Sequence, residues 1–276
     1  MNADVDPGPA RGILWKAPTP DATYHVRRAP PASLRAFVQH FWIVRWDLRG
    51  HPPQVQETLP HPNVYLIFEE GRACVFGVHT ARYSRVLEEK GFAFGVKFRP
   101  GGFRPWLGRA VASIADRSIA PTDVFADAVD LDERLAAVAD NDDALIDAAA
   151  AFLEPRRPPC DPLVERAVER VAAIVGEIAS DVSIARVEQL AERHAMTPRA
   201  LQRLFRDYVG ASPKWVIARY RLHEAVERIG RGEAIDWSTL ALDLGYFDQA
   251  HFIRDFKRLV GWAPAEYARR ARVPRV

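Results

Sequence analysis

Apolar residues between about residue 24 and residue 100 fall into short runs that are separated by turn-forming residues. Four of these runs are rich in aromatic and β-branched residues, which is typical of strands. They are FWIVRW from Phe41, VYLIFEE from Val64, ACVFGV from Ala73 and FAFGVKF from Phe92. The segments HPPQ, LPHPN, EEGR and EEKG supply the turns. A short helix from Arg28 precedes the first strand, and the frequent turns favour an antiparallel barrel or sandwich.

After Pro100 the apolar residues recur three and four apart, which predicts helices over 101–116, 121–129 and 131–155. The segment PRRPPCDP, from Pro155 to Pro162, breaks this pattern and is the best linker candidate. Everything after it has helical periodicity. We therefore expect an α+β chain with a disordered tail (1–23), an antiparallel β-barrel domain with accessory helices (24–157) and an all-α domain (158–272).

The composition is that of a globular protein: 276 residues, of which 48% are hydrophobic and 27% charged. Two cysteines give no disulfide framework, the N-terminus lacks the apolar core of a signal peptide, and no stretch approaches a membrane span. We expect a cytoplasmic protein with no membrane partner. The net charge of +2 says little about nucleic acid, so the placement of arginines on individual helices matters more.

The segment from Ile184 to Tyr208 has the pattern of a helix-turn-helix unit. An amphipathic helix over 184–193 is followed by the turn His194-Ala195-Met196, and Thr197 with Pro198 forms an N-cap and first helical position. The next helix buries one face and turns four polar side chains outward, and arginine and glutamine are the side chains that pair with guanine and adenine edges in a major groove. These candidate DNA-binding residues are Arg199, Gln202, Arg203 and Arg206. A solvated charged face is the alternative for a lone helix, and the preceding helix, turn and cap argue against it.

A second unit follows from Trp237 to Leu259, with Gly245-Tyr246-Phe247 as its turn and Asp248 as the cap of its second helix. Its outward candidates for DNA binding are Gln249, Ala250, Ile253, Arg254 and Lys257. Ile253 suits a thymine methyl group or extra core packing equally well. The pattern predicts a helix from Pro213 to about Ile229, capped by Ser212, that joins the two units. We expect it to hold the two reading helices about one DNA turn apart, ~34 Å.

The segment from about Asp161 to Arg270 resembles the DNA-binding domain of the AraC/XylS family of bacterial transcription regulators. The match runs through ALQRLFRDYVGASPKWVIARYRLHEA and LALDLGYFDQAHFIRDFKRLVGWAPAEY. The resemblance implies a seven-helix domain that places two helices in successive major grooves of promoter DNA. Apolar Ala250 and Ile253 stand where the family often has small polar residues, which makes the first unit the expected base reader and the second the expected backbone anchor.

The N-terminal half resembles a cupin-like sensor domain of one AraC subgroup, through ETLPHPNVYLIFEE, CVFGVHT and FGVKFRPGGFRPWLG. The resemblance implies a small-molecule effector in this domain, homodimerisation, or both, together with contact to RNA polymerase and a role as an activator. It names no ligand and no cofactor.

An enzyme tethered to DNA by its helical domain is the rival interpretation, and an architectural protein without an effector is a third. An enzyme needs a metal or a nucleophile. His51, His61 and His79 lack metal-ligand spacing, and Cys74 in an apolar strand is expected to be a core residue, so we predict no catalytic residue, no metal and no cofactor.

Overall fold

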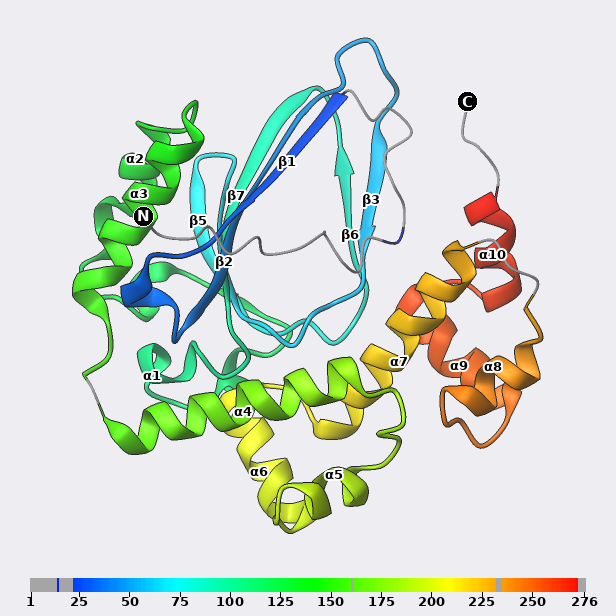
Figure 1. The fold of residues 1–276 in the computed structure, drawn as a ribbon. Coiled ribbons are helices and arrows are strands. Elements are labelled where there is room, and N and C mark those ends of the chain that lie inside the picture. The colour runs from blue at the N-terminus through cyan, green and yellow to red at the C-terminus, as the bar shows by residue number, and fades with distance from the viewer. Residues whose placement is uncertain (1–13, 15–21, 160, 232–234, 273–276) are drawn as a thin grey trace.

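The computed structural model describes residue 14 and residues 22–159, 161–231 and 235–272 (Figure 1). The expected disordered tail therefore lies outside the described residues, except for Leu14, Ala22 and Thr23. Among the described residues, no helix combines the length and the apolar character needed to cross a bilayer.

The N-terminal strands form two antiparallel sheets. The larger has the order β1-β2-β7-β4-β5-β8, and the smaller pairs β3 with β6. The bounds are β1 Thr23–Arg28, β2 Val38–Asp47, β3 Gln54–Thr58, β4 Tyr65–Glu69, β5 Arg72–Phe76, β6 Tyr83–Leu87, β7 Lys90–Phe98 and β8 Ser118–Ile119. The four predicted strands correspond to β2, β4, β5 and β7. The strands β1, β3, β6 and β8 were not predicted, because segments such as QVQET (54–58) contain no apolar run.

The two faces of the large sheet have different surroundings. Phe41, Phe68 and Phe94 point to one face and form a core with the accessory helices, which lie along the sheet in Figure 1. Trp42 packs over Gly95 on the opposite face, because the side chains of a strand alternate between faces. The aromatic residues of this half therefore do not line one common interior.

The accessory helices are shorter than predicted: α1 spans Arg104–Leu107, α2 Leu131–Ala136 and α3 Asp142–Leu153. Single 3₁₀ turns occupy much of the remaining segment, including Val111–Ile114 and Pro121–Asp123. The helix expected from Arg28 is likewise reduced to a 3₁₀ turn at Ala32–Leu34.

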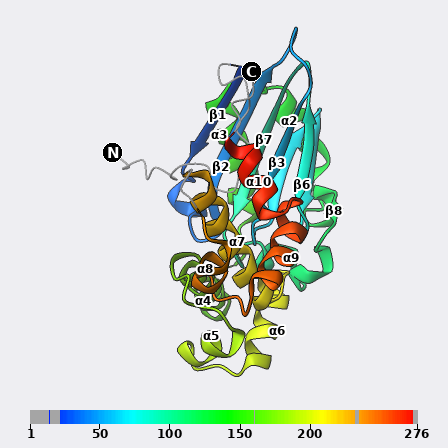
Figure 2. The same ribbon diagram turned by 90° about the vertical axis from the view of Figure 1, so that its right-hand side faces the viewer.

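The C-terminal part forms seven helices among its described residues, as expected. They are α4 Pro162–Ser180, α5 Val187–Arg193, α6 Pro198–Tyr208, α7 Pro213–Gly230, α8 Trp237–Asp243, α9 Gln249–Val260 and α10 Pro264–Arg272. One buried cluster joins α4, α5, α6 and the start of α7, and another joins the end of α7 with α8, α9 and α10. We call these the first and second lobes, and α7 runs between them (Figures 1 and 2).

The β-domain contacts both lobes and the helix between them. Val78 is buried in the core of the first lobe, while Leu14 and Leu59 are buried in the core of the second. The Trp215 Nε1 of α7 donates a hydrogen bond to the Thr80 carbonyl oxygen at 3.1 Å. Because these contacts involve all three parts, the β-domain constrains how the two lobes are placed.

Candidate nucleic-acid interface

The second helix of the first unit, α6, begins as the sequence predicts. The Thr197 hydroxyl accepts a hydrogen bond from the Ala200 amide at 3.1 Å, and Pro198 takes the first helical position. Leu201 and Phe205 are fully buried beneath the helix. The face opposite these two residues is therefore free of core contacts.

The four outward residues of α6 are all exposed, as expected. Their spacing places them on one side of the helix. Within the described part of the chain, their guanidinium groups form no ion pair, so they are available to phosphates or base edges. The residues are Arg199, Gln202, Arg203 and Arg206.

The first helix of this unit, α5, begins three residues later than predicted, at Val187. Ile184 is buried ahead of the helix rather than inside it. A polar network fixes α5 to α4: the Arg193 guanidinium lies 2.8 Å from the Glu177 carboxylate and 2.6 Å from that of Asp181. The hydrogen bond from Arg193, more than that from His194, lowers the pKa of Glu177.

The joining helix α7 begins at Pro213, where the Ser212 hydroxyl accepts a hydrogen bond from the Trp215 amide at 3.2 Å, as predicted. Its 18 residues give a rod of about 27 Å. The one-turn separation of the two reading helices stays a prediction.

Arg221, which the sequence pattern did not single out, packs between the lobes. Its guanidinium lies 5.6 Å from the ring centroid of Tyr246 in the second unit. A Cβ on Gly245 would come within 2.6 Å of Arg221 Nη2 and 3.0 Å of the Ala185 Cβ in the first unit. Burial lowers the pKa of Arg221. The side chain therefore occupies the junction of the two units.

The second unit has the same local construction. The Asp236 carboxylate caps α8 by accepting from the Ser238 and Thr239 amides, and Asp248 caps α9 by accepting from the His251 amide at 2.6 Å. The turn between the helices contains Gly245 with a left-handed φ of +67°. The sequence-predicted cap and turn are both confirmed.

The outward face of α9 is less polar than that of α6. Ala250, Arg254 and Lys257 are exposed, whereas Gln249 and Ile253 are half-buried. The Gln249 Oε1 accepts a hydrogen bond from the Ser238 hydroxyl at 3.0 Å, and Ile253 packs against the second-lobe core. Part of the predicted reading face is therefore held inside the protein.

Phe247, in the turn before α9, is 90% exposed. The sequence pattern indicates only that Phe247 belongs to the turn, although an aromatic residue between Tyr246 and a capping aspartate was a usable signal. Tyr246 takes the buried position instead, and its ring meets that of Phe252 edge-on at 5.4 Å. Phe247 is thus the most exposed large apolar side chain at this end of α9.

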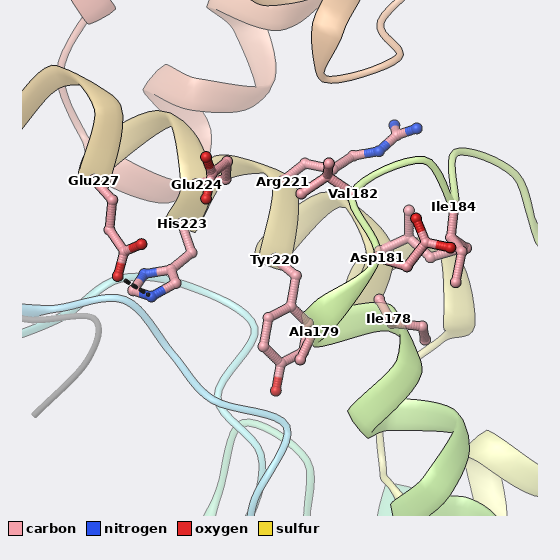
Figure 3. A pocket seen from close by; sticks show the side chains of 11 residues that line it. Ile178, Ala179, Asp181, Val182, Ile184, Tyr220, Arg221, His223, Glu224 and Glu227 are labelled. Atoms are coloured by element: carbon pink, nitrogen blue, oxygen red, sulfur yellow. Dashed lines mark ion pairs between the residues drawn. The ribbon is translucent and has the colours of Figure 1, made fainter. Parts of the chain in front are cut away.

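A polar cavity of about 40 Å³ lies where the end of α4 faces α7 (Figure 3). Tyr220, His223 and Glu227 of α7 line one side, and the His223 Nε2 lies 3.2 Å from the Glu227 carboxylate. A volume of this size accommodates one or two water molecules rather than a metabolite.

The candidate groups for enzyme chemistry do not assemble. His51 is exposed, His61 contacts Arg219, and no three His, Cys, Asp or Glu side chains gather to hold a metal within the described ranges. Burial, with a smaller contribution from Asp132, raises the pKa of the Cys74 thiol, which disfavours the thiolate. Cys74 is half-buried on the sheet face opposite the core rather than in the core as expected.

Comparisons with known proteins match each half of the chain to a different family. Residues 26–120 match a family described as "Domain of unknown function (DUF6597)", and residues 190–270 match one described as "Helix-turn-helix domain".

Curated relatives resemble the C-terminal part. The RCS-specific HTH-type transcriptional activator RclR of Escherichia coli is 34% identical over 86 residues, which are 31% of this chain and 30% of RclR. The XylDLEGF operon transcriptional activator 1 of Pseudomonas putida is 31% identical over 108 residues, 38% of this chain and 32% of that protein. The chain thus spans less than a third of the length of these relatives.

Among solved structures, apo ToxT of Vibrio cholerae aligns over 87% of this chain and 98% of its own, with 12% identity and a TM-score of 0.39. ToxT bound to an unsaturated fatty acid gives a TM-score of 0.35 with 12% identity, over 78% of this chain and 86% of its own. Both are too distant to place a ligand here.

The capped helices, the two turns, the joining helix and the matched segment agree with one another. This chain carries a double helix-turn-helix domain of the AraC/XylS type in its C-terminal part, behind an N-terminal domain of the DUF6597 family.

Proposed function

We propose that this protein is a sequence-specific DNA-binding transcription regulator. The observation that carries the proposal is the exposed, unpaired arginine face of α6, mounted on a correctly capped helix-turn-helix. The named activities of the relatives are those of transcriptional activators, and we extend activation, contact with RNA polymerase and a cytoplasmic location to this chain as part of the proposal.

Within this function the two units have different roles. Arg199, Gln202, Arg203 and Arg206 of α6 read base edges in a major groove. In α9, Arg254 and Lys257 hold the phosphate backbone, while Ala250 and the exposed edge of Ile253 contribute contact with a thymine methyl group. Gln249 is the weakest candidate, because its carbonyl oxygen already accepts a hydrogen bond from Ser238.

The N-terminal domain supplies effector sensing, dimerisation, or both. The support is that side chains of this domain, Val78 and Leu59, are buried in the cores of the first and second lobes. We therefore expect a change within the domain to alter the spacing of the reading helices. The enzyme alternative has no comparable support, because the pKa of the Cys74 thiol is raised rather than lowered.

Selection of bound DNA from a random duplex library by the full chain tests the function. We expect an enriched motif with strong base preference in one half and weak preference about one helical turn away. Affinity for the motif should fall steeply with salt, because each arginine–phosphate contact releases condensed counterions. If the selected DNA shows no enriched motif at low salt, specific binding is contradicted. If base preference is equally strong in both halves of the motif, the reader-and-anchor assignment is contradicted.

A further inference from the structure

The turn before α9 carries a phenylalanine that the protein core does not use. Phe247 is 90% exposed, whereas Tyr24 and Tyr83, which also reach the surface, are 48% and 41% exposed. A single exposed apolar side chain is common on protein surfaces. The position of Phe247 in the helix-turn-helix unit therefore decides what its exposure indicates.

The packing of the turn explains why Phe247 points away from the core. A hydrophobic residue directly before an N-cap often packs against the fourth residue of the helix. In α9 the cap is Asp248 and the fourth residue is Phe252. Tyr246 takes this contact instead, with its ring centroid 5.4 Å from that of Phe252. Phe247 is therefore left outside the core, immediately ahead of the capped end of the helix.

This end of α9 is the one that a helix-turn-helix unit brings to the bases. In such units the second helix contacts base edges in the major groove through its N-terminal residues. The Ser238 hydroxyl donates to the Gln249 Oε1 at 3.0 Å and so holds the N-terminal ends of α8 and α9 together. The exposed residues Ala250 and Arg254 follow along α9. Phe247 thus extends the candidate DNA-binding face of the second unit at its N-terminal end.

The carboxylates nearest to Phe247 in the sequence are engaged within the unit. Asp236 caps α8, Asp248 caps α9, and the Asp243 carboxylate lies 3.1 Å from the Arg228 guanidinium. Because each contact directs a carboxylate to helix amides or to an arginine, these groups oppose the approach of DNA phosphates less than free carboxylates would. The surroundings of Phe247 are therefore compatible with a nucleic-acid surface.

An apolar ring in a major groove has one matching group among the four bases. Thymine alone presents a 5-methyl group there, and phenylalanine is among the side chains that contact it. Ala250 offers only a methyl group and Ile253 is half-buried, so Phe247 offers the largest apolar surface of the three. We propose that Phe247 reads the 5-methyl group of a thymine in the half of the DNA motif bound by the second unit. This inference rests on the proposed function and adds one base-specific contact to the anchoring helix.

Replacement of thymine by uracil in the DNA tests the contact, because the two bases differ only in the 5-methyl group. The full chain is titrated by fluorescence anisotropy with the duplex selected from the random library. Thymines in the half with weaker base preference are replaced one at a time. At one position we expect uracil to weaken binding of the parent about fourfold, the value of burying one methyl-sized group.

The decisive variant is Phe247→Ala. It should bind the thymine duplex about fourfold to tenfold more weakly than the parent, and uracil at the sensitive position should have no further effect. Phe247→Leu keeps an apolar side chain and should keep the dependence on the methyl group. Because Phe247 is exposed, Tm should be the same in the parent and both variants, which separates loss of contact from loss of folding.

Two controls define the specificity of the effect. Leu163→Ala removes a leucine that is 74% exposed on α4, outside both helix-turn-helix units, and should behave as the parent. Uracil in the half with stronger base preference should affect the parent and Phe247→Ala equally, because the first unit binds that half.

Three results would overturn the inference. The weaker half could contain no thymine, uracil at every position could affect the parent and Phe247→Ala equally, or Phe247→Ala could bind every duplex as the parent does. The second result with weakened binding would assign the ring to the sugar-phosphate backbone, and the third would assign it to a protein partner. In all three the parent still prefers the selected duplex to a scrambled one. Loss of that preference in the parent would instead remove the proposed function, and this inference with it.

Discussion

The two helix-turn-helix units share a construction and differ in the surface they present. Each second helix is capped by a side-chain oxygen, from Thr197 in the first unit and Asp248 in the second. The outward face of α6 is fully exposed and rich in arginine, whereas α9 keeps Gln249 and Ile253 half inside the protein. The same backbone motif therefore supports the proposal of a reader in one lobe and an anchor in the other, because recognition depends on the side chains that remain exposed once the core has formed.

The largest expected effect is the loss of stability on removal of a buried ring from each lobe, which tests whether the two lobes are equally well packed. Phe205→Ala in the first lobe and Phe256→Ala in the second each remove a fully buried ring. Each should lower the free energy of unfolding by about 3–5 kcal/mol, through lost transfer energy and a residual cavity. Urea unfolding of the full chain measures this. A loss below about 1 kcal/mol in one lobe alone would mean that this lobe is not independently packed.

Removing charges from the outward faces should separate reader from anchor. Arg203→Ala in α6 should cost about 1–3 kcal/mol of specific DNA affinity and relax base preference at one position. Arg254→Ala in α9 should weaken binding to all sequences alike and reduce the salt slope by about 1.

Arg258→Ala is the matched control, because Arg258 lies on α9 but pairs with Asp255 at 3.0 Å. Titration of selected and scrambled duplexes by fluorescence anisotropy provides the measurement. If Arg254→Ala relaxes base preference as much as Arg203→Ala does, α9 is a reader too.

Exchanging glycine and alanine in the turns of the two units should change the stability in opposite directions. Gly245 has φ +67°, and an added Cβ would meet Arg221 at 2.6 Å, so Gly245→Ala should lower the free energy of unfolding by about 1–2 kcal/mol. Ala195 occupies the first turn with φ +49°, a strained conformation for alanine. Ala195→Gly should therefore be neutral or stabilising by up to about 1 kcal/mol. Chemical denaturation of both variants checks the pair, and two changes of the same sign would contradict the interpretation.

Loss of a helix N-cap should lower the free energy of unfolding by a similar amount in each unit, and by less than the changes above. Thr197→Ala and Asp248→Ala each remove the acceptor of one helix N-terminal amide, worth about 1 kcal/mol. Thr197→Ser and Asp248→Asn keep an acceptor and serve as controls. Thermal unfolding should show the loss in the alanine variants and its recovery in the controls; loss in the controls as well would assign the effect to packing.

Acid should loosen the network that fixes α5 to α4 in the first unit, whereas the corresponding arginine network of the second unit, from Arg228 to Glu224 and Asp243, joins α8 to α7 and does not include α9. The pKa of Glu177 is lowered by its hydrogen bonds from Arg193 and His194. Ser183, and next Arg193, hold the pKa of Asp181 at about 2. A carboxylate with a lowered pKa stabilises the fold above its unfolded pKa, and that contribution is lost as the pH falls through the folded value.

We therefore expect amide hydrogen exchange to quicken in α5 before α9 as the pH is lowered from about 5 towards 2. Both groups are partly exposed to solvent, so this is the smallest of the expected effects. In Glu177→Gln the acid sensitivity of α5 should be reduced, and equal quickening of α5 and α9 in the parent would contradict the assignment.

The sequence by itself determined the elements that depend on local chemistry. Thr197, Ser212 and Asp248 act as caps because a short side-chain oxygen reaches the amide two or three residues ahead, whatever surrounds the helix. The buried stripe of α6 and the turn at Gly245 follow from spacing and backbone freedom in the same way. These local rules were sufficient to predict the helices of the two units, the joining helix and the outward residues of the first unit, whereas the number of seven helices followed from the resemblance to the AraC/XylS family.

Only the tertiary structure decided features that involve residues distant in the sequence. The strands β3 and β6 pair with each other, and neither contains a continuous apolar run like those of β2, β4, β5 and β7. Ile253 is half-buried because the second-lobe core extends to it, which helical spacing left undecided. Arg219 and Pro60 are more than a hundred residues apart, and nothing local indicates that folding buries this guanidinium against the Pro60 carbonyl oxygen. The environment of a charge is set by what packs around it, so it becomes visible only once the chain has folded.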